Sequence, residues 1–91
     1  MTAKRVIFKG HVQGVGFRYT VKDLARSFDV CGWVRNLPNG DVELQAMGEA
    51  SEVASFIREI AEESNVSHHI KTFMAETIPL FTGVSGFVIT G

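Results

Sequence analysis

The hydrophobic and polar positions of the chain change their period several times along its length. Three segments in the first half, 4–10, 30–34 and 42–47, are rich in β-branched residues or alternate apolar with polar residues, which predicts strands. Two segments in the second half, about 69–77 and about 86–90, have the same character. We therefore expect four strands and a short additional strand near the end of the chain.

Two segments between these strands repeat their apolar residues every three or four positions, which is the spacing of one face of an α-helix. The first helix is expected to begin at Phe17 and to end at Asp29. The second has Ser51 as its candidate N-cap and Asn65 as its end. The apolar faces consist of Phe17, Val21, Leu24, Ala25 and Phe28 in the first helix and of Val53, Phe56, Ile57, Ile60 and Ala61 in the second.

A turn is predicted at 37–41, where Pro38 precedes Asn39 and Gly40, two residues that tolerate positive φ. The order of elements is then strand–helix–strand–strand–helix–strand (βαββαβ). Two helices with apolar faces, and too few strands for two packed sheets, predict an α+β fold. We expect the ferredoxin-like split βαβ sandwich, with two helices packed on one face of an antiparallel sheet. This fold hosts many activities, so it does not identify the function.

Length and composition limit the class of protein. The chain has 91 residues, of which 45% are hydrophobic, and this predicts a single globular domain over 1–91. Its formal charge of -1 offers no general attraction for nucleic acid, and no segment is long enough to span a bilayer. Cys31 is the only cysteine, which excludes an internal disulfide and a cysteine-based zinc site. We expect a soluble cytoplasmic protein, and a monomer because the pattern leaves no spare hydrophobic face.

The glycine-rich segment between the first strand and the first helix is the main candidate for chemistry. Gly14 and Gly16 permit backbone conformations in which successive amide N–H groups point to one anion, and the helix N-terminus adds partial positive charge. Arg18 follows in the first helical turn, and its planar guanidinium matches two phosphate oxygens. Loop chemistry alone leaves a phosphate site and an ordinary strand-to-helix connection equally open. The dinucleotide fingerprint is excluded because Tyr19 replaces its third glycine, and no P-loop sequence follows.

Two motifs resemble the signatures of the acylphosphatase family. The first is Gly10-x-Val12-Gln13-Gly14-Val15-Gly16-Phe17-Arg18, and the second is Gly32-Trp33-Val34-Arg35-Asn36-x-x-x-Gly40-x-Val42, followed by Gly48. The resemblance covers essentially the whole chain, including the closing segment 86–89. It implies an enzyme that hydrolyses the carboxyl–phosphate anhydride of small acyl phosphates to a carboxylate and inorganic phosphate. It also implies that neither a metal nor a cofactor is needed.

The same resemblance implies a role for individual residues. The family's phosphate-binding arginine falls on Arg18, and its water-positioning asparagine falls on Asn36. The main chain that binds the phosphate falls on Val12, Gln13, Gly14, Val15, Gly16, Phe17 and Arg18. By itself Asn36 would be a turn residue, but in a split βαβ fold its strand returns beside the loop. The chain ends in Thr90-Gly91, where family members commonly have basic residues, so the role of this terminus stays open.

The other chemically notable residues are expected to be structural. His68 and His69 are expected to point to opposite faces of a strand and not to share a metal, and His11 is at most a modulator of the loop. Core packing is the expected role of Tyr19, Cys31 and Trp33. The glutamates of the second helix, Glu59, Glu62 and Glu63, are expected to form a solvated face.

Three other functions are compatible with this fold, and the sequence bears on each of them. A module of a hydrogenase-maturation carbamoyltransferase would act on carbamoyl phosphate, but Met1 stands almost at the first strand, which favours a free enzyme. An RNA-binding module on this fold needs exposed aromatic motifs and a basic surface, and the chain has neither. A non-catalytic anion-sensing domain stays open. Among acyl phosphates, the sequence does not select between acetyl, carbamoyl and bisphosphoglycerate substrates.

Overall fold

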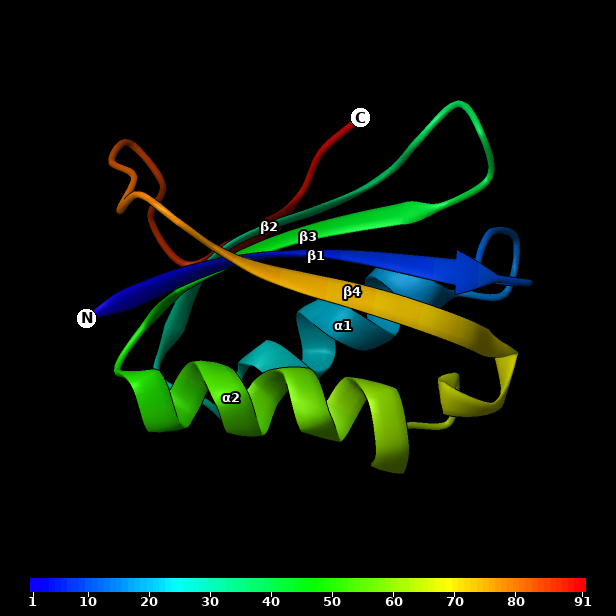
Figure 1. Cartoon of the computed structure of the whole chain (residues 1–91), viewed down its shortest axis with the longest axis horizontal. Coiled ribbons are helices and arrows are strands. Elements are labelled where there is room, and N and C mark those ends of the chain that lie inside the picture. Colours follow the sequence, from blue (N-terminus) through cyan, green and yellow to red (C-terminus); the bar gives the residue numbers. More distant parts are fainter.

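A five-stranded sheet covered by helices on one face is the architecture of the computed structural model, which describes residues 1–91 (Figure 1). The strands are β1 (Thr2–Gly10), β2 (Val30–Asn36), β3 (Val42–Gly48), β4 (Ile70–Ile78) and β5 (Phe87–Ile89). The helices are α1 (Phe17–Ala25) and α2 (Ala50–Arg58). A π-helical turn (Glu59–Glu63) continues α2, and a 3-10 turn (Ser67–His69) precedes β4. The expected α+β fold is confirmed.

The strand order is β4-β1-β3-β2-β5. Strand β3 lies between β1 and β2 and is antiparallel to both, which is the split βαβ arrangement. Strand β4 is antiparallel to β1 at one edge of the sheet. The expected antiparallel pairing does not extend to the other edge, where the short strand β5 is parallel to β2. Strand β4 runs opposite to β1 and β2. The chain reverses once between β4 and β5, so β5 runs in the same direction as β2.

The helix boundaries differ from those expected at three places. One of them is the end of α2, which stops at Arg58 and passes into the π-helical turn before the expected Asn65. Helix α1 ends at Ala25, before Asp29, because the amides of residues 26–28 donate to carbonyls three residues back at 3.0–3.2 Å and tighten the chain into a turn. Helix α2 begins at Ala50 with Glu49 as its N-cap, and Ser51 does not cap it. The reason is that β3 continues to Gly48, so the chain enters the helix directly.

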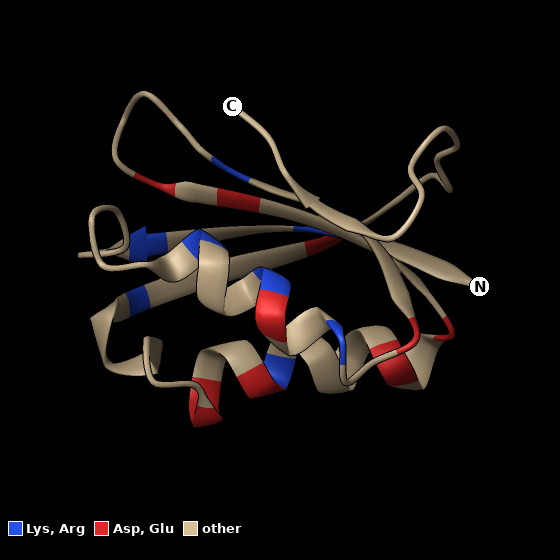
Figure 2. Ribbon diagram, turned by 180° about the vertical axis from the view of Figure 1, so that it is seen from behind, with Lys and Arg blue, Asp and Glu red and all other residues tan.

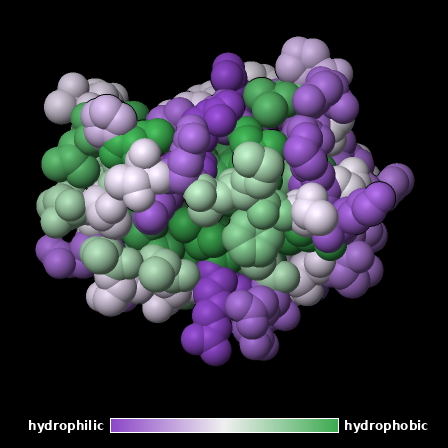
Figure 3. Space-filling view, in the orientation of Figure 1, coloured by the Kyte–Doolittle hydropathy of each residue, from purple (hydrophilic) through white to green (hydrophobic).

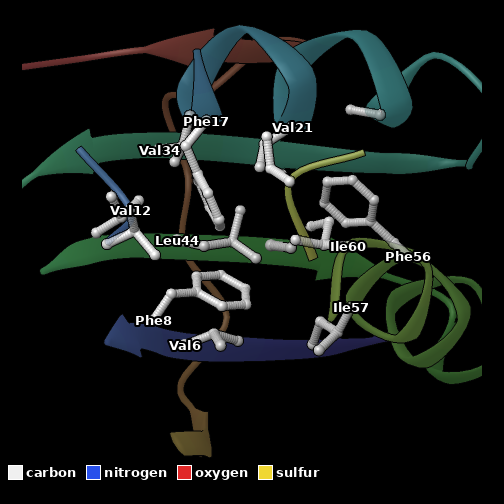
Figure 4. Packing of buried hydrophobic residues seen from close by; sticks show 14 of the residues in the cluster. Val6, Phe8, Val12, Phe17, Val21, Val34, Leu44, Phe56, Ile57 and Ile60 are labelled. Atoms are coloured by element: carbon white, nitrogen blue, oxygen red, sulfur yellow. The ribbon is translucent and has the colours of Figure 1, made fainter. Parts of the chain in front are cut away.

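The hydrophobic core lies between the sheet and the two helices (Figure 4). Phe8 from β1 and Phe17 from α1 meet there with ring centroids 5.1 Å apart. Val12 belongs to the loop before α1, yet only 1% of it is exposed and it packs in the same cluster. Burying a side chain of this size contributes about 1.5–3 kcal/mol. The core therefore anchors the loop on which the candidate chemistry depends.

The opposite face of the sheet carries a buried carboxylate. Glu43 stands at a polar position of the alternating strand β3, but its side chain is 3% exposed and lies between Arg5 and Arg35. Arg35 donates to Glu43 Oε1 at 2.7 Å, and Arg5 donates to Glu43 Oε2. Burial alone would raise the pKa of Glu43, but the hydrogen bonds and charges of both arginines hold that pKa below its ordinary value. The two guanidiniums thus stabilise the buried carboxylate of Glu43 on the face of the sheet opposite the helices.

Strand β4 is an uncovered edge of the sheet. Phe73 is 43% exposed and Met74 is 68% exposed. In the orientation of Figure 1, β4 is the strand nearest the viewer. Figure 3, in the same orientation, shows hydrophobic residues gathered at the centre of the face turned to the viewer. The expectation that no hydrophobic face is left uncovered is therefore wrong, because the helices pack mainly over β1, β2, β3 and β5 and leave Phe73 and Met74 of β4 exposed. No helix of the chain has both the length and the hydrophobicity to cross a membrane.

Candidate active site

The backbone conformation of the loop between β1 and α1 depends on two glycines. Gly14 and Gly16 both have φ of 78°, in the left-handed region that residues with a Cβ rarely adopt. Gly16 is the N-cap of α1, and its carbonyl accepts the amide of Thr20 at 3.0 Å. No side chain caps this helix. The first-turn amides of α1 thus lie at the loop, where a helix N-terminus favours an anion.

A small pocket joins this loop to the end of β2. Its volume is about 120 Å³, and it is lined by Val12, Gly14, Gly16, Phe17, Arg18, Tyr19 and Asn36. A space of this size takes only a small group, which is the scale of a phosphoryl group and not of a large organic ligand. The structure therefore brings Arg18 and Asn36, which are far apart in the sequence, around one space. Two predicted loop residues, Gln13 and Val15, do not line it.

Arg18 stands in the first turn of α1 and is half-buried. It takes part in none of the six ion pairs of the molecule, so no carboxylate neutralises its charge. A guanidinium presents five N–H donors in a plane and remains charged at neutral pH. Arg18 can therefore bind two oxygens of a phosphoryl group at the pocket.

Asn36 is the last residue of β2, and it pairs with Val42 of β3 just before the hairpin turn. The turn predicted at 37–41 is confirmed: the amide of Gly40 donates to Leu37 O at 3.2 Å. The side-chain amide of Asn36 both donates and accepts hydrogen bonds, so it can orient a water molecule. As an amide it is no base at neutral pH.

The side chain of Gln13 makes two contacts that the sequence does not indicate. Its Nε2 atom donates to the carbonyl of Leu37 at 2.8 Å and to the carbonyl of Asp41 at 2.9 Å. These bonds fasten the loop to the hairpin that follows Asn36. The local sequence carries no signal for them, since the two carbonyls are 24 and 28 residues away along the chain.

The hairpin is also attached to β1 beside the loop. Lys9 Nζ lies 2.7 Å from Asp41 Oδ2, and the Asn39 side-chain amide donates to the same oxygen at 3.1 Å. The amide of Asp41 in turn donates to Asn39 Oδ1 at 3.1 Å. Asp41 is buried, so its carboxylate needs these donors. The loop and the hairpin therefore form one connected unit around the pocket.

Three histidines gather where the loop leaves β1. The expectation that His68 and His69 point apart is wrong: their ring centroids are 4.0 Å apart, because both lie in a 3-10 turn and not in a strand. The ring of His11 is 5.9 Å from that of His69. Partial burial and the two neighbouring imidazoles lower the pKa of His69. No group of three or more His, Cys, Asp or Glu residues in the chain has the geometry to hold a metal ion.

The structure changes the expected roles of three further residues. Tyr19 was expected in the core but is 72% exposed and lines the pocket. Trp33 and Cys31 are only half-buried in β2, and the guanidinium of Arg35 lies 5.3 Å from the centre of the Trp33 ring. At the chain end, the amide of Thr90 donates to Val34 O at 2.9 Å and Gly91 lies beside Arg35.

Comparison with known proteins identifies the family of the chain. The acylphosphatase family model matches residues 4–89. The acylphosphatase of Lacticaseibacillus paracasei is 33% identical over 89 residues, which are 98% of this chain and 96% of that protein. The crystal structure of acylphosphatase from Bacillus subtilis matches with a TM-score of 0.89 and 33% identity over 100% of both chains.

A larger protein contains a similar segment. The structure of full-length HypF in its phosphate- and nucleotide-bound form matches 99% of this chain with a TM-score of 0.82 and 28% identity, but the match covers 12% of that chain. The other two relatives match along nearly their full length, as does the family model on this chain. This chain therefore belongs to the acylphosphatase family.

Proposed function

We propose that this acylphosphatase binds the phosphoryl group of its substrate with the main chain of 12–18 and the Arg18 guanidinium, while Asn36 positions the attacking water. The observation that carries this assignment is the single small pocket lined by both Arg18 and Asn36. The water oxygen bonds to phosphorus, the bond from phosphorus to the acyl oxygen breaks, and the electron pair leaves on the carboxylate. The products are a carboxylate and inorganic phosphate.

The chemistry of the leaving group explains why so few residues are needed. A carboxylate leaves readily, so the step depends mainly on positioning and on stabilising the charge of the phosphoryl oxygens. Arg18 and the amides at the start of α1 supply that charge. Asn36 cannot accept the proton of the water, so we assign that proton to a phosphoryl oxygen of the substrate. The proposed mechanism uses no metal and no covalent intermediate.

The experiment is to follow hydrolysis of acetyl phosphate by the purified protein in excess chelator, with Arg18→Ala and Asn36→Ala as variants. We expect turnover to resist the chelator and kcat/KM to fall about 10²–10³-fold in Arg18→Ala, the loss typical of one preorganised donor. Arg26→Ala is the matched control, because Arg26 is on the same α1 side of the molecule but does not line the pocket. Circular dichroism of each variant checks that it is folded.

Inhibition by inorganic phosphate separates the two roles. Arg18→Ala should weaken this inhibition together with turnover, whereas Asn36→Ala should lower kcat and leave phosphate binding nearly unchanged. Equal weakening of phosphate binding in both variants would contradict the role of Asn36. A wild-type protein that binds phosphate and hydrolyses neither acetyl nor carbamoyl phosphate would be an anion-sensing domain instead. Loss of turnover in chelator would contradict the metal-free mechanism.

A further inference from the structure

Tyr19 lines two hollows of the surface. On one side it lines the pocket with Arg18 and Asn36. On the other side it lines a groove of about 500 Å³ between α1 and the π turn after α2. This groove is open to solvent and larger than the first pocket, which has a volume of about 120 Å³. No other residue lines both spaces.

The groove offers a surface for the organic part of a substrate. Tyr19 is 72% exposed, so its ring is not covered by the rest of the chain. Leu24, five residues further along α1, adds a half-buried apolar side chain to the same groove. An aromatic ring with a polar tip is suited to a ligand that is apolar on one side and solvated on the other. Tyr19 is the residue shared by the pocket of Arg18 and this groove, so it is the side chain closest to both.

The charges that line the groove are all negative. Asp23 of α1 and Glu59 and Glu63 of the π turn line it, with no Lys, Arg or His among the lining residues. Figure 2 shows acidic positions on both helical segments that border this space. Asp23 lies 3.6 Å from Arg26, but both side chains are about three-quarters exposed, so this ion pair is weak. Glu59 and Glu63 take part in none of the ion pairs.

We propose that Tyr19 and this groove bind the acyl group of the substrate, and that the three carboxylates select acyl groups without negative charge. The inference rests on the proposed function, in which Arg18 binds the phosphoryl group. Neutral or cationic acyl groups, aromatic ones above all, gain contact with the Tyr19 ring. Acyl groups that carry a carboxylate or a second phosphate are repelled. Of the substrates that the sequence left open, bisphosphoglycerate is therefore disfavoured.

The role of the ring is tested with benzoyl phosphate and acetyl phosphate, whose methyl group has little surface to bury. Tyr19→Ala should lower the ratio of kcat/KM for benzoyl over acetyl phosphate about 3–10-fold, the range of an aromatic pair. Tyr19→Phe is the matched control and should keep the ratio within about twofold, because it retains the ring. An unchanged ratio in Tyr19→Ala would overturn the assignment of Tyr19.

The role of the charges is tested with 4-carboxybenzoyl phosphate against benzoyl phosphate. Two charges about 8 Å apart in water change an equilibrium roughly twofold, so the double variant Glu59→Gln/Glu63→Gln should raise the relative kcat/KM for the carboxylated substrate about fourfold. Added salt should reduce the discrimination of the wild type. Glu62→Gln is the control, since Glu62 is in the same turn but does not line the groove. Equal ratios in the double variant and the wild type would contradict charge selection.

The outcomes separate this inference from the assignment of the catalytic pocket. If Arg18→Ala retains full turnover of acetyl phosphate, the phosphoryl site itself is misplaced. If Arg18→Ala is inactive but the substrate ratios do not respond to Tyr19→Ala, the phosphoryl site stands and the acyl group binds elsewhere. A loss in Tyr19→Ala that is equal for both substrates would place Tyr19 at the phosphoryl end and would also overturn the proposal.

Discussion

At the scale of single residues, Glu43 is a charged side chain that the fold buries and pairs with two arginines. It stands at a polar position of an alternating strand, yet its side chain is enclosed by Arg5 and Arg35. A buried carboxylate without donors would be costly, whereas this one accepts a hydrogen bond on each oxygen. The stability of the folded state should therefore depend on the ionisation of this residue.

We predict a pH-dependent contribution of Glu43 to the free energy of unfolding. Because its pKa in the folded state is below the ordinary value of 4.5, its stabilising effect is complete above pH 4.5 and is lost as the pH falls through the lowered pKa. Glu43→Gln should destabilise the protein at neutral pH by about 1–3 kcal/mol, since it leaves the arginine donors poorly paired. Urea unfolding as a function of pH measures both effects.

Glu76→Gln is the comparison for this prediction. Glu76 also approaches Arg5, at 3.6 Å, but its side chain is 63% exposed. An exposed ion pair contributes about 0–1 kcal/mol, so this variant should unfold nearly as the wild type does. Equal losses in the two variants would show that burial does not determine the strength of the Arg5–Glu43–Arg35 cluster.

Motif resemblance and periodicity differ in how well they predicted the placement of single residues. The two signatures predicted that Arg18 and Asn36 act together, and the structure places both at one pocket. The roles given to Tyr19, His68 and His69 rested on helix and strand periodicity, and periodicity does not say which surface the rest of the chain covers. The exposed ring of Tyr19 and the close pair of imidazoles are consequences of packing between distant segments.

At the scale of elements, the loop before α1 and the β2–β3 hairpin act as one unit. The contact between them is the Gln13 side chain, which donates to two carbonyls of the hairpin. The ion pair between Lys9 and Asp41 adds a second attachment. Since Arg18 follows the loop and Asn36 precedes the hairpin, these contacts set the separation of the two proposed catalytic side chains.

We predict that Gln13→Ala lowers both stability and turnover. Loss of two hydrogen bonds should reduce the free energy of unfolding by about 1–3 kcal/mol. A displacement of about 1 Å between catalytic groups can cost about 10²-fold in rate, so we expect kcat to fall by about 10- to 100-fold. Thermal unfolding and acetyl phosphate hydrolysis measure the two effects.

Two further variants make this prediction specific. Gln13→Glu should fail in the same way as Gln13→Ala, because a carboxylate cannot donate to the carbonyls of Leu37 and Asp41. Gln45→Ala, which removes a partly exposed glutamine of β3, should retain turnover. If Gln13→Ala is destabilised but its kcat is unchanged, the bridge has a structural role only.

At the scale of the whole molecule, the uncovered strand β4 bears on the oligomeric state. An exposed edge strand is a template for pairing with another chain, and charged residues on it oppose such pairing. Lys71 and Glu76 are exposed charged residues of β4, on either side of the apolar Phe73 and Met74. We expect these charges to keep the protein monomeric.

Sedimentation equilibrium at micromolar concentration tests this prediction, and a single species of 10.0 kDa is expected. Lys71→Ala/Glu76→Ala should increase self-association, because it removes the charges and keeps the apolar residues. A wild-type dimer that dissociates in Met74→Lys would contradict the prediction and would identify β4 as the interface.

Much of the fold was predictable because it depends on local patterns. The helical spacing from Phe17 and from Val53, the turn at 37–41 and the order of elements all follow from residues within a few positions of one another. The errors concern features that depend on distant segments: the end of α1, the parallel pairing of β5 and the close approach of the His68 and His69 rings. Local propensity does not contain the packing that decides them.

The sequence by itself determined the family, the α+β architecture and the pair Arg18 and Asn36 as the candidates for chemistry. Two long motifs and a regular periodicity are properties of neighbouring residues, so they can be read without coordinates. Only the tertiary structure decided how the pocket is bounded, which residue joins the loop to the hairpin, and that Tyr19 opens onto an acidic groove. The reason is that each of these features is made by segments that the sequence separates and that only the packing of α1, the hairpin and the π turn brings together.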